Sequence, residues 1–399
     1  RKLAIKDNIL IKNRISSSGS RILSNYVASY DATVIKKLRD AGAVFVGRTN
    51  MDEFAMGAST ENSAYGATKN PHDISRVPGG SSGGSAVAVA AGLCDAALGS
   101  DTGGSIRQPA SFCGVVGMKP TYGRVSRYGL TALASSLDQI GPFAKSVSDA
   151  EKIYQVIAGP DENDSTTVDA KFFETKKDEK LKIGVPRHLI SSGVEQDVLQ
   201  NFEETLEKLK QAGHEIVEIE LPAVKYSLAC YYIIMPAEAS SNLSRFDGLR
   251  YGLKKEGSNL LEDYLQTRGT GFGAETRRRI ILGTYVLSAG YYDAYYGQAT
   301  RVREVIKQDF ARAFAQVDTI ILPTAPTTAF KIGEKSGDPL QMYLADVFTA
   351  PANIAGLPAI SIPTGKDQNN LPIGTQLIAP HWREERLFAL GKNLEELVK

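Results

Sequence analysis

Residues 78–84 read Pro-Gly-Gly-Ser-Ser-Gly-Gly, and residues 99–105 read Gly-Ser-Asp-Thr-Gly-Gly-Ser. Between these two loops, residues 85–92 are all Ser, Ala, Val or Gly, which predicts a helix buried on all sides because it has no polar face. The amide N–H groups at the start of a helix point toward whatever lies before it. The stretch therefore predicts two glycine-rich loops around one buried helix, with amide groups directed at the first loop.

Outside this stretch, helical and strand patterns alternate along the chain. Strands are predicted over residues 44–47, 182–186, 215–221 and 319–322, the first of them buried, and helices over residues 33–41 and 198–212. This alternation predicts α/β packing. The charged stretch 161–180 is typical of a linker or a surface excursion.

The composition excludes several classes of protein. A length of 399 residues suits one large α/β domain or two smaller ones, and a net charge of +1 gives no overall field to attract nucleic acid or a membrane. No apolar stretch is long enough to span a bilayer, and the N-terminus lacks the apolar core of a signal peptide. Cys94, Cys113 and Cys230 are too few for a disulfide framework or a metal site, which favours a reducing, cytoplasmic location.

The second glycine loop has the features of a nucleophile beside an oxyanion site. Glycines allow the backbone to approach a ligand closely, and successive amide N–H groups in such a turn suit a developing oxyanion. Ser105 would present its hydroxyl next to them, and Asp101 and Arg107 flank the turn and could hold it through hydrogen bonds. The pattern is typical of acyl transfer from an amide.

The base that would serve Ser105 is less certain from pattern alone. The four histidines, His72, His188, His214 and His381, lie in no turn that marks them as buried, so a Ser–His–Asp triad stays possible but unsupported. Lys6 is flanked by apolar residues, as in a buried strand, and desolvation can make a lysine basic enough to serve. A glycine-rich loop that binds phosphate is the alternative, although it would lack the Lys-Ser/Thr end of a P-loop.

Taken together, the ordered motifs resemble the amidase signature family. The resemblance rests on residues 78–85, 99–110 and 114–123, and on a lysine upstream in an Ile-Lys-Asp-Asn context. It implies a Ser–Ser–Lys triad in which Ser105 is the nucleophile, Ser81, preceded by a cis peptide bond, is the bridge, and Lys6 is the base. The backbone N–H groups of Thr102, Gly103, Gly104 and Ser105 are implied as the oxyanion hole.

The same resemblance implies the family's fold. We expect one large α/β/α domain over residues 1–399, with a mixed, mostly parallel central sheet covered by helices on both faces. Residues 161–330 are expected to form an inserted or peripheral lobe that contributes residues to the substrate pocket. Family members carry a helical segment before the lysine motif, whereas here five residues precede Lys6.

Within the family, the chain is similar to the branch that releases ammonia from glutamine for tRNA-dependent amidation. The similarity lies in residues 50–57, 126–129, 134–141, 238–248, 277–283 and 291–296. It implies that Arg279 binds the α-carboxylate of glutamine, that Asp346 binds the α-ammonium, and that Tyr231 lines the pocket. Arginine suits the first role because it can grip a carboxylate with two hydrogen bonds.

The resemblance also implies partners. A second, B-type subunit would use ATP and Mg²⁺ to activate Glu-tRNA(Gln), and possibly Asp-tRNA(Asn), in a heterotrimer completed by a small C-type subunit. This chain itself would hold no cofactor and no metal, and the overall reaction would be that of a carbon–nitrogen ligase with glutamine as amido donor. Two alternatives remain: a free-standing amidase for another small amide with the same triad, and a non-catalytic scaffold that binds a ligand in its glycine-rich loops.

Overall fold

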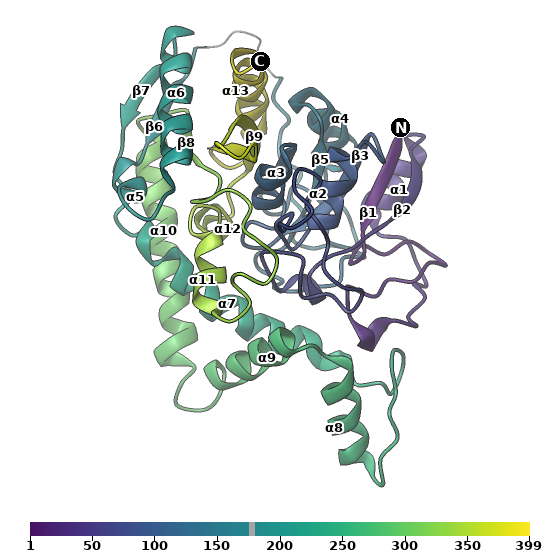
Figure 1. The fold of residues 1–399 in the computed structure, drawn as a ribbon. Helices are drawn as coiled ribbons and strands as arrows, with labels where there is room; N and C mark the ends of the chain where they lie inside the picture. The colour runs from purple at the N-terminus through teal and green to yellow at the C-terminus, as the bar shows by residue number, and fades with distance from the viewer. Residues whose placement is uncertain (175–179) are drawn as a thin grey trace.

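The computed structural model describes residues 1–174 and 180–399 of the chain. Ten strands form one sheet in the order β2-β1-β3-β5-β4-β9-β10-β8-β6-β7. The strands are β1 (Lys2–Lys6), β2 (Val44–Thr49), β3 (Ala96–Asp101), β4 (Val116–Lys119), β5 (Gln139–Ala144), β6 (Lys182–Val185), β7 (Glu215–Glu218), β8 (Thr319–Pro323), β9 (Ala359–Lys366) and β10 (Pro372–Ile378). Figure 1 shows β6, β7 and β8 at one side of the molecule and β1 and β2 at the other.

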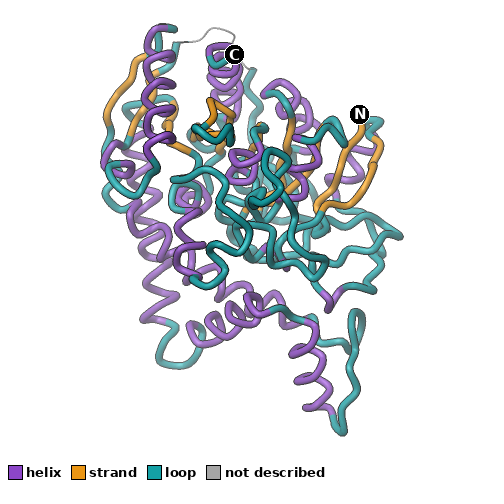
Figure 2. Tube along the Cα trace, viewed as in Figure 1, coloured by secondary structure: helices purple, strands orange, loops and turns teal. Residues whose placement is uncertain are grey.

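Helices pack on the sheet and extend beyond it (Figure 2). They are α1 (Thr33–Asp40), α2 (Gly83–Ala90), α3 (Arg107–Cys113), α4 (Val147–Ile157), α5 (Arg187–Ile190), α6 (Gln196–Gln211), α7 (Ser227–Asn242), α8 (Leu260–Gly271), α9 (Ala274–Val286), α10 (Gln298–Phe314), α11 (Pro339–Tyr343), α12 (Ala350–Ala355) and α13 (Glu384–Leu397). Helix α6 shows why they pack: its buried residues Val198, Phe202 and Leu209 recur at helical spacing, so one face is apolar.

Two glycine contacts show that helices cover both faces of the sheet. Gly374 of β10 lies against Ser111 of α3, and Gly374 pairs in register with Pro363 of β9. The preceding residue of β9, Ile362, lies against Gly391 of α13. Successive residues of a strand point to opposite faces, so α3 and α13 cover opposite sides of the sheet. The predicted α/β/α layering is confirmed.

The sheet is mixed, but the expectation that it is mostly parallel is wrong. Among the described strands, β1–β2, β1–β3, β6–β7 and β6–β8 pair in parallel, whereas β3–β5, β4–β5, β4–β9, β9–β10 and β8–β10 are antiparallel. Short connections explain the central antiparallel part, because β9 and β10 form a hairpin and need no crossover helix.

Most predicted elements are confirmed within a few residues, and strand β2 is the exception in burial. Val44 and Val46 are 60% and 47% exposed. The strand lies at the edge of the sheet, next to β1 alone, and an edge strand of this kind carries the same apolar residues as a buried one. The prediction of a buried strand at residues 44–47 is therefore wrong.

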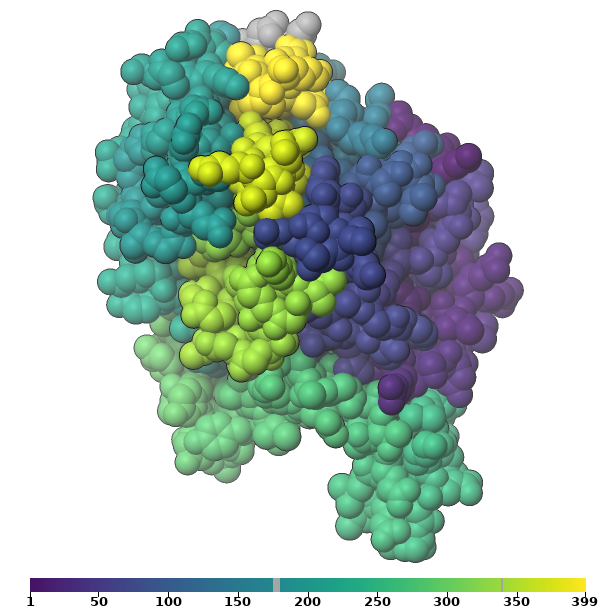
Figure 3. Space-filling model, viewed as in Figure 1, coloured from purple at the N-terminus to yellow at the C-terminus, as the bar shows by residue number. Residues whose placement is uncertain are grey.

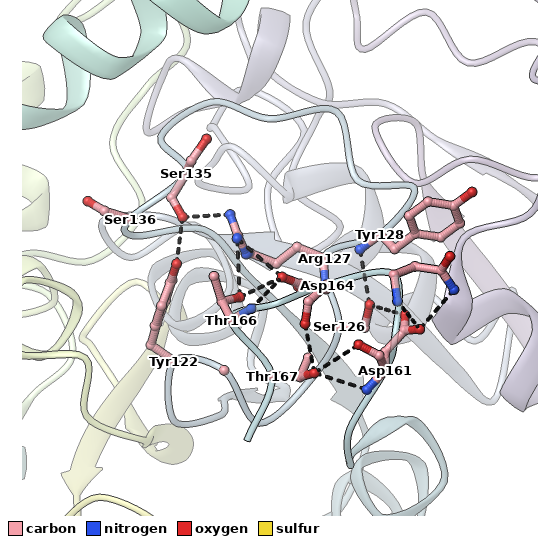
Figure 4. A network of polar contacts seen from close by, with 12 residues as sticks. Tyr122, Ser126, Arg127, Tyr128, Ser135, Ser136, Asp161, Asp164, Thr166 and Thr167 are labelled. Carbon is pink, nitrogen blue, oxygen red and sulfur yellow. Dashed lines mark hydrogen bonds and ion pairs between the residues drawn. The ribbon is translucent and has the colours of Figure 1, made fainter. Parts of the chain in front are cut away.

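The stretch from residue 161 is bound to the body of the protein rather than free of it. Arg127 donates its backbone N–H to Asp164 Oδ2 at 2.7 Å, and its side chain reaches the carbonyl of Ser135, as Figure 4 shows. Ser126 Oγ donates to Asp161 Oδ2 at 2.5 Å. The predicted linker thus begins as an anchored segment, and its residues 175–179 lie outside the described part.

Helix α8 lies in a lobe that projects from the main body, seen at the bottom of Figure 3. The lobe is tied to the N-terminal part through Leu253 N, which donates to Ile22 O at 2.7 Å. Within residues 1–174 and 180–399, every helix is too short or too polar to cross a bilayer.

Candidate active site

Lys6 ends strand β1 and points its amine into the protein, where the side chain is fully buried. Its Nζ lies 2.8 Å from Ser81 Oγ, 2.8 Å from Ser82 Oγ and 2.9 Å from Ser100 Oγ. Ser82 Oγ donates its proton to the carbonyl of Ser100 at 3.1 Å, so Ser82 can only accept from Lys6. Asn8 Nδ2 also donates to Ser100 Oγ at 2.9 Å. The amine is therefore held in a fixed ring of hydroxyls.

The surroundings of Lys6 favour a neutral amine. Burial lowers the pKa of Lys6 to about 7, although the carboxylates of Asp52, Asp101 and Asp138 act in the opposite direction. In the described part of the chain, no carboxylate lies within ion-pairing distance of Nζ. At neutral pH a large fraction of the amine is thus unprotonated and able to accept a proton.

Ser81 lies on the turn that leads into α2, and the peptide bond between Gly80 and Ser81 is cis, as the resemblance implies. Two side chains hold this turn. Thr60 Oγ1 donates to Gly79 O at 2.8 Å and accepts from Gly83 N at 3.1 Å, while Gln108 Oε1 accepts from Gly80 N at 2.9 Å. Ser81 is itself fully buried, so its hydroxyl is fixed against the Lys6 amine.

Ser105 lies on the loop between β3 and α3 and is 7% exposed. Its carbonyl accepts from Ser82 N at 3.2 Å, which places the two glycine loops side by side. Among the described residues, the Ser105 hydroxyl makes no hydrogen bond to Lys6 or Ser81, and the amides of Gly103, Gly104 and Ser105 donate none to other residues. The loop therefore offers a hydroxyl beside unpaired N–H donors, the arrangement that an oxyanion site requires.

Arg107 holds this loop in place. Its Nε and one terminal nitrogen each lie 3.0 Å from the two carboxylate oxygens of Asp101, and both residues are fully buried. The guanidinium also donates to the Thr349 carbonyl at 2.9 Å and to the side chains of Asn353 and Gln376. The suggestion that Asp101 and Arg107 hold the turn is confirmed.

Tyr231 and Asp346 both lie against the same glycine loop. A Cβ atom on Gly103 would fall 2.6 Å from Tyr231 Cζ, and one on Gly104 would fall 3.2 Å from Asp346 Oδ1. Only glycine fits at these positions, and Gly104 also has a φ of +147°. Burial raises the pKa of Asp346 to about 7, opposed by the Arg279 guanidinium.

Arg279 joins this group through aromatic rings. Its guanidinium carbon lies 5.2 Å from the ring centre of Tyr232 and 5.1 Å from that of Tyr343, and Tyr232 Oη lies 3.3 Å from Asp346 Oδ2. Arg279 Nε donates to Glu275 Oε1 at 2.7 Å. Arg279, Glu275 and Tyr343 line a cavity of about 150 Å³. Tyr231, Arg279 and Asp346 therefore converge near Ser105, although they come from three separate segments.

Comparison with known proteins identifies the family. A family model described as Amidase matches residues 3–388. The chain belongs to the amidase family. The A subunit of glutamyl-tRNA(Gln) amidotransferase from Microcystis aeruginosa is 56% identical over 99% of this chain and 83% of its own length. The same subunit from Desulfatibacillum aliphaticivorans is 54% identical, over 99% and 82% of the two chains.

Solved amidase-family structures share the fold. The crystal structure of the glutamyl-tRNA(Gln) amidotransferase A subunit from Thermotoga maritima has a TM-score of 0.84 at 51% identity, covering 97% of this chain and 81% of that chain. The substrate complex of 6-aminohexanoate cyclic dimer hydrolase has a TM-score of 0.87 at 27% identity, covering 100% and 84%. The same architecture is thus found in proteins whose names specify different amides.

Several residues of this amidase site were not singled out from the sequence. Ser100, Ser82 and Asn8 complete the surroundings of Lys6, and Tyr232 connects Arg279 with Asp346. Ser82 and Ser100 lie inside the glycine-rich motifs, so their position was a usable signal, whereas Tyr232 had none beyond its neighbour Tyr231. Among the described residues, no group of three or more His, Cys, Asp or Glu side chains is placed to hold a metal ion.

Proposed function

We propose that this chain hydrolyses glutamine as the ammonia-releasing component of a tRNA-dependent amidotransferase. The observation that carries the proposal is the convergence of Arg279, Asp346 and Tyr231 on the glycine loop that presents Ser105. A guanidinium and a carboxylate on one pocket match the α-carboxylate and α-ammonium of a free amino acid. Relatives 54–56% identical over nearly the whole chain carry the corresponding name.

In this mechanism, the Ser105 hydroxyl oxygen attacks the side-chain carboxamide of glutamine. Ser105 gives its proton to Ser81 Oγ while Ser81 gives its own proton to the neutral amine of Lys6, 2.8 Å away. The amides of residues 102–105 stabilise the oxyanion. Lys6 then returns the proton through Ser81 to the leaving nitrogen, the C–N bond breaks, and ammonia leaves a γ-glutamyl ester on Ser105. Water hydrolyses that ester to glutamate and regenerates the free hydroxyl.

Substrate binding is assigned to the other wall of the site. Glu275 binds the Nε edge of Arg279, which directs the remaining guanidinium nitrogens toward an incoming carboxylate. Asp346, ionised above a pKa of about 7, binds the ammonium, and the Tyr231 ring packs beside the aliphatic part of the substrate. These roles distinguish glutamine from simple amides, which lack both charged groups.

The released ammonia would be used by partner proteins. We infer a complex with a B-type subunit, which activates Glu-tRNA(Gln) with ATP and Mg²⁺, and with a small C-type subunit. The support is the printed name of the relatives, which specifies the amidation of glutamyl-tRNA(Gln). On this basis, glutaminase activity of the isolated chain is expected to be weak and to rise when the partners and charged tRNA are added. Equal turnover alone and in the complex would contradict this coupling.

Mass spectrometry after treatment with a glutamine-like electrophile tests the nucleophile. We expect one label on Ser105 in the wild-type chain, none in Ser105→Ala, and protection by excess glutamine. Ser111, which is 3% exposed and lies on the helix that follows, serves as the control position through Ser111→Ala, which should label normally. A label elsewhere, or no protection by glutamine, would overturn the proposal.

A further inference from the structure

Asp52 is a buried carboxylate that the mechanism so far leaves unused. It is fully buried just before a short helical turn (Glu53–Ala55), and its oxygens accept three backbone N–H groups. The donors are Thr60 at 2.8 Å, Asn62 at 3.0 Å and Ser59 at 3.4 Å. One carboxylate therefore folds the whole loop over residues 59–62.

That loop supports the turn that carries Ser81. Asp52 N donates to Ser81 O at 3.3 Å, and Thr60, held by the Asp52 carboxylate, bridges Gly79 and Gly83 on either side of the turn. The carboxylate also packs against the turn directly, because a Cβ atom on Gly80 would fall 2.2 Å from Asp52 Oδ2. Asp52 and Lys6 thus both contact the segment that carries this serine, one through its backbone and the other through its hydroxyl.

The charges around Lys6 distinguish Asp52 from the other acids. Three carboxylates act on the amine, namely Asp52, Asp101 and Asp138. Asp101 is already paired with Arg107, and Asp138 accepts from Thr102 Oγ1 at 2.7 Å on the side of the oxyanion loop. Asp52 has no cation within 4.0 Å among the described residues, and burial raises its pKa to about 6. It is therefore ionised at neutral pH without a paired cation.

We propose that Asp52 is a positioning residue that fixes the Ser81 turn and supplies the countercharge for Lys6 when Lys6 takes the proton of the nucleophile. Before the reaction Lys6 is neutral and Asp52 negative, and after proton transfer the two charges balance across Ser81. The inference rests on the proposed function, because it requires Lys6 to be the base.

The test is the rate at which a fluorophosphonate labels Ser105 in the full chain, followed against pH. This probe needs no glutamine, so it reports proton transfer alone. In Asp52→Asn the lost negative charge should move the acidic limb of the profile to lower pH by about one unit, because Lys6 loses a proton more easily. The plateau rate should fall about tenfold, because the protonated Lys6 is no longer balanced.

Thr60→Val is the matched control, since it removes the bridge to Gly79 and Gly83 but keeps the carboxylate. It should lower the plateau without moving the limb. Asp52→Ser, smaller and uncharged, replaces Asp52→Asn if that variant melts below the assay temperature. An unmoved or upward-moved limb in the uncharged variants overturns the countercharge role, as does an equal shift in Thr60→Val. A wild-type chain that is not labelled at Ser105 would instead reject the proposed function itself.

Discussion

The two walls of the site are built in different ways. Lys6, Ser81 and Ser105 come from the first 105 residues, are at most 7% exposed, and are held by hydrogen bonds within and between neighbouring loops. Arg279 and Asp346 come from distant segments and are held by aromatic packing, with the rings of Tyr232 and Tyr343 stacked 3.9 Å apart. The reaction geometry therefore depends on one compact motif, whereas substrate choice depends on a scaffold assembled from far along the chain. The two should fail separately.

The largest effect is expected on the first wall. Lys6→Ala and Ser105→Ala should each lower the kcat for glutamine hydrolysis by about 10⁴-fold or more, because the groups act as one unit. For the same reason the double variant should be no slower than either single one. Measuring released glutamate in all three variants checks this, and near-wild-type turnover in Lys6→Ala would reject Lys6 as the base.

On the second wall, Arg279→Lys should raise the KM for glutamine by about 10- to 100-fold, with a smaller change in kcat. Lysine keeps the charge but loses the two-pronged geometry that fits a carboxylate. Arg277→Lys, an exposed position on the same helix, is the control and should behave as wild type. If the two variants have the same KM, Arg279 does not bind the substrate.

The pH dependence of KM separates the walls further. The raised pKa of Asp346, about 7, means that its ionised fraction falls as the pH drops through that value. The KM for glutamine should therefore rise about tenfold per unit below pH 7, because a neutral carboxyl no longer attracts the ammonium. Asp346→Asn should have a high KM that no longer depends on this ionisation. A wild-type KM that stays flat from pH 6 to pH 8 would contradict the assignment.

The smallest effect is expected away from both walls. The ion pair between Arg187 and Glu203 lies at the β6 and β7 side of the sheet, and the two side chains are 43% and 50% exposed. Arg187→Ala should change the free energy of unfolding by less than about 0.5 kcal/mol, since exposed pairs are screened by water. Glutaminase kinetics should not change. Chemical denaturation gives the first value, and a large loss would show that this edge contributes more than exposed pairs usually do.

Sequence pattern predicted the elements better than their arrangement. The apolar run around Lys6 indicated a buried strand, and β1 has that strand with Lys6 fully buried. Strand direction was not predicted, because whether β9 and β10 pair as a hairpin depends on long-range packing rather than on local composition. The exposure of Val44 was missed for a similar reason, since only the assembled sheet shows which strand has one neighbour.

The same limit applies to the site. The glycine motifs indicated where Ser81 and Ser105 lie, because close backbone approach requires glycine. Asp52 carried no signal of its own, since its contacts with the turn arise only when distant loops meet. The roles of Lys6, Ser81, Ser105, Arg279, Asp346 and Tyr231, and the division that assigns residues 161–330 to a lobe, stay predictions until the experiments above are done.

Arg107 has a consequence for how the protein is made. The guanidinium belongs to the early part of the chain, but its partners Asn353 and Gln376 lie 246 and 269 positions later. During synthesis from the N-terminus, the nucleophile loop therefore exists long before the groups that satisfy its buried cation. A chain shortened before Asn353 should contain every residue of the proton relay and still be inactive. Competence is reached only when the C-terminal strands of the polypeptide have emerged and docked.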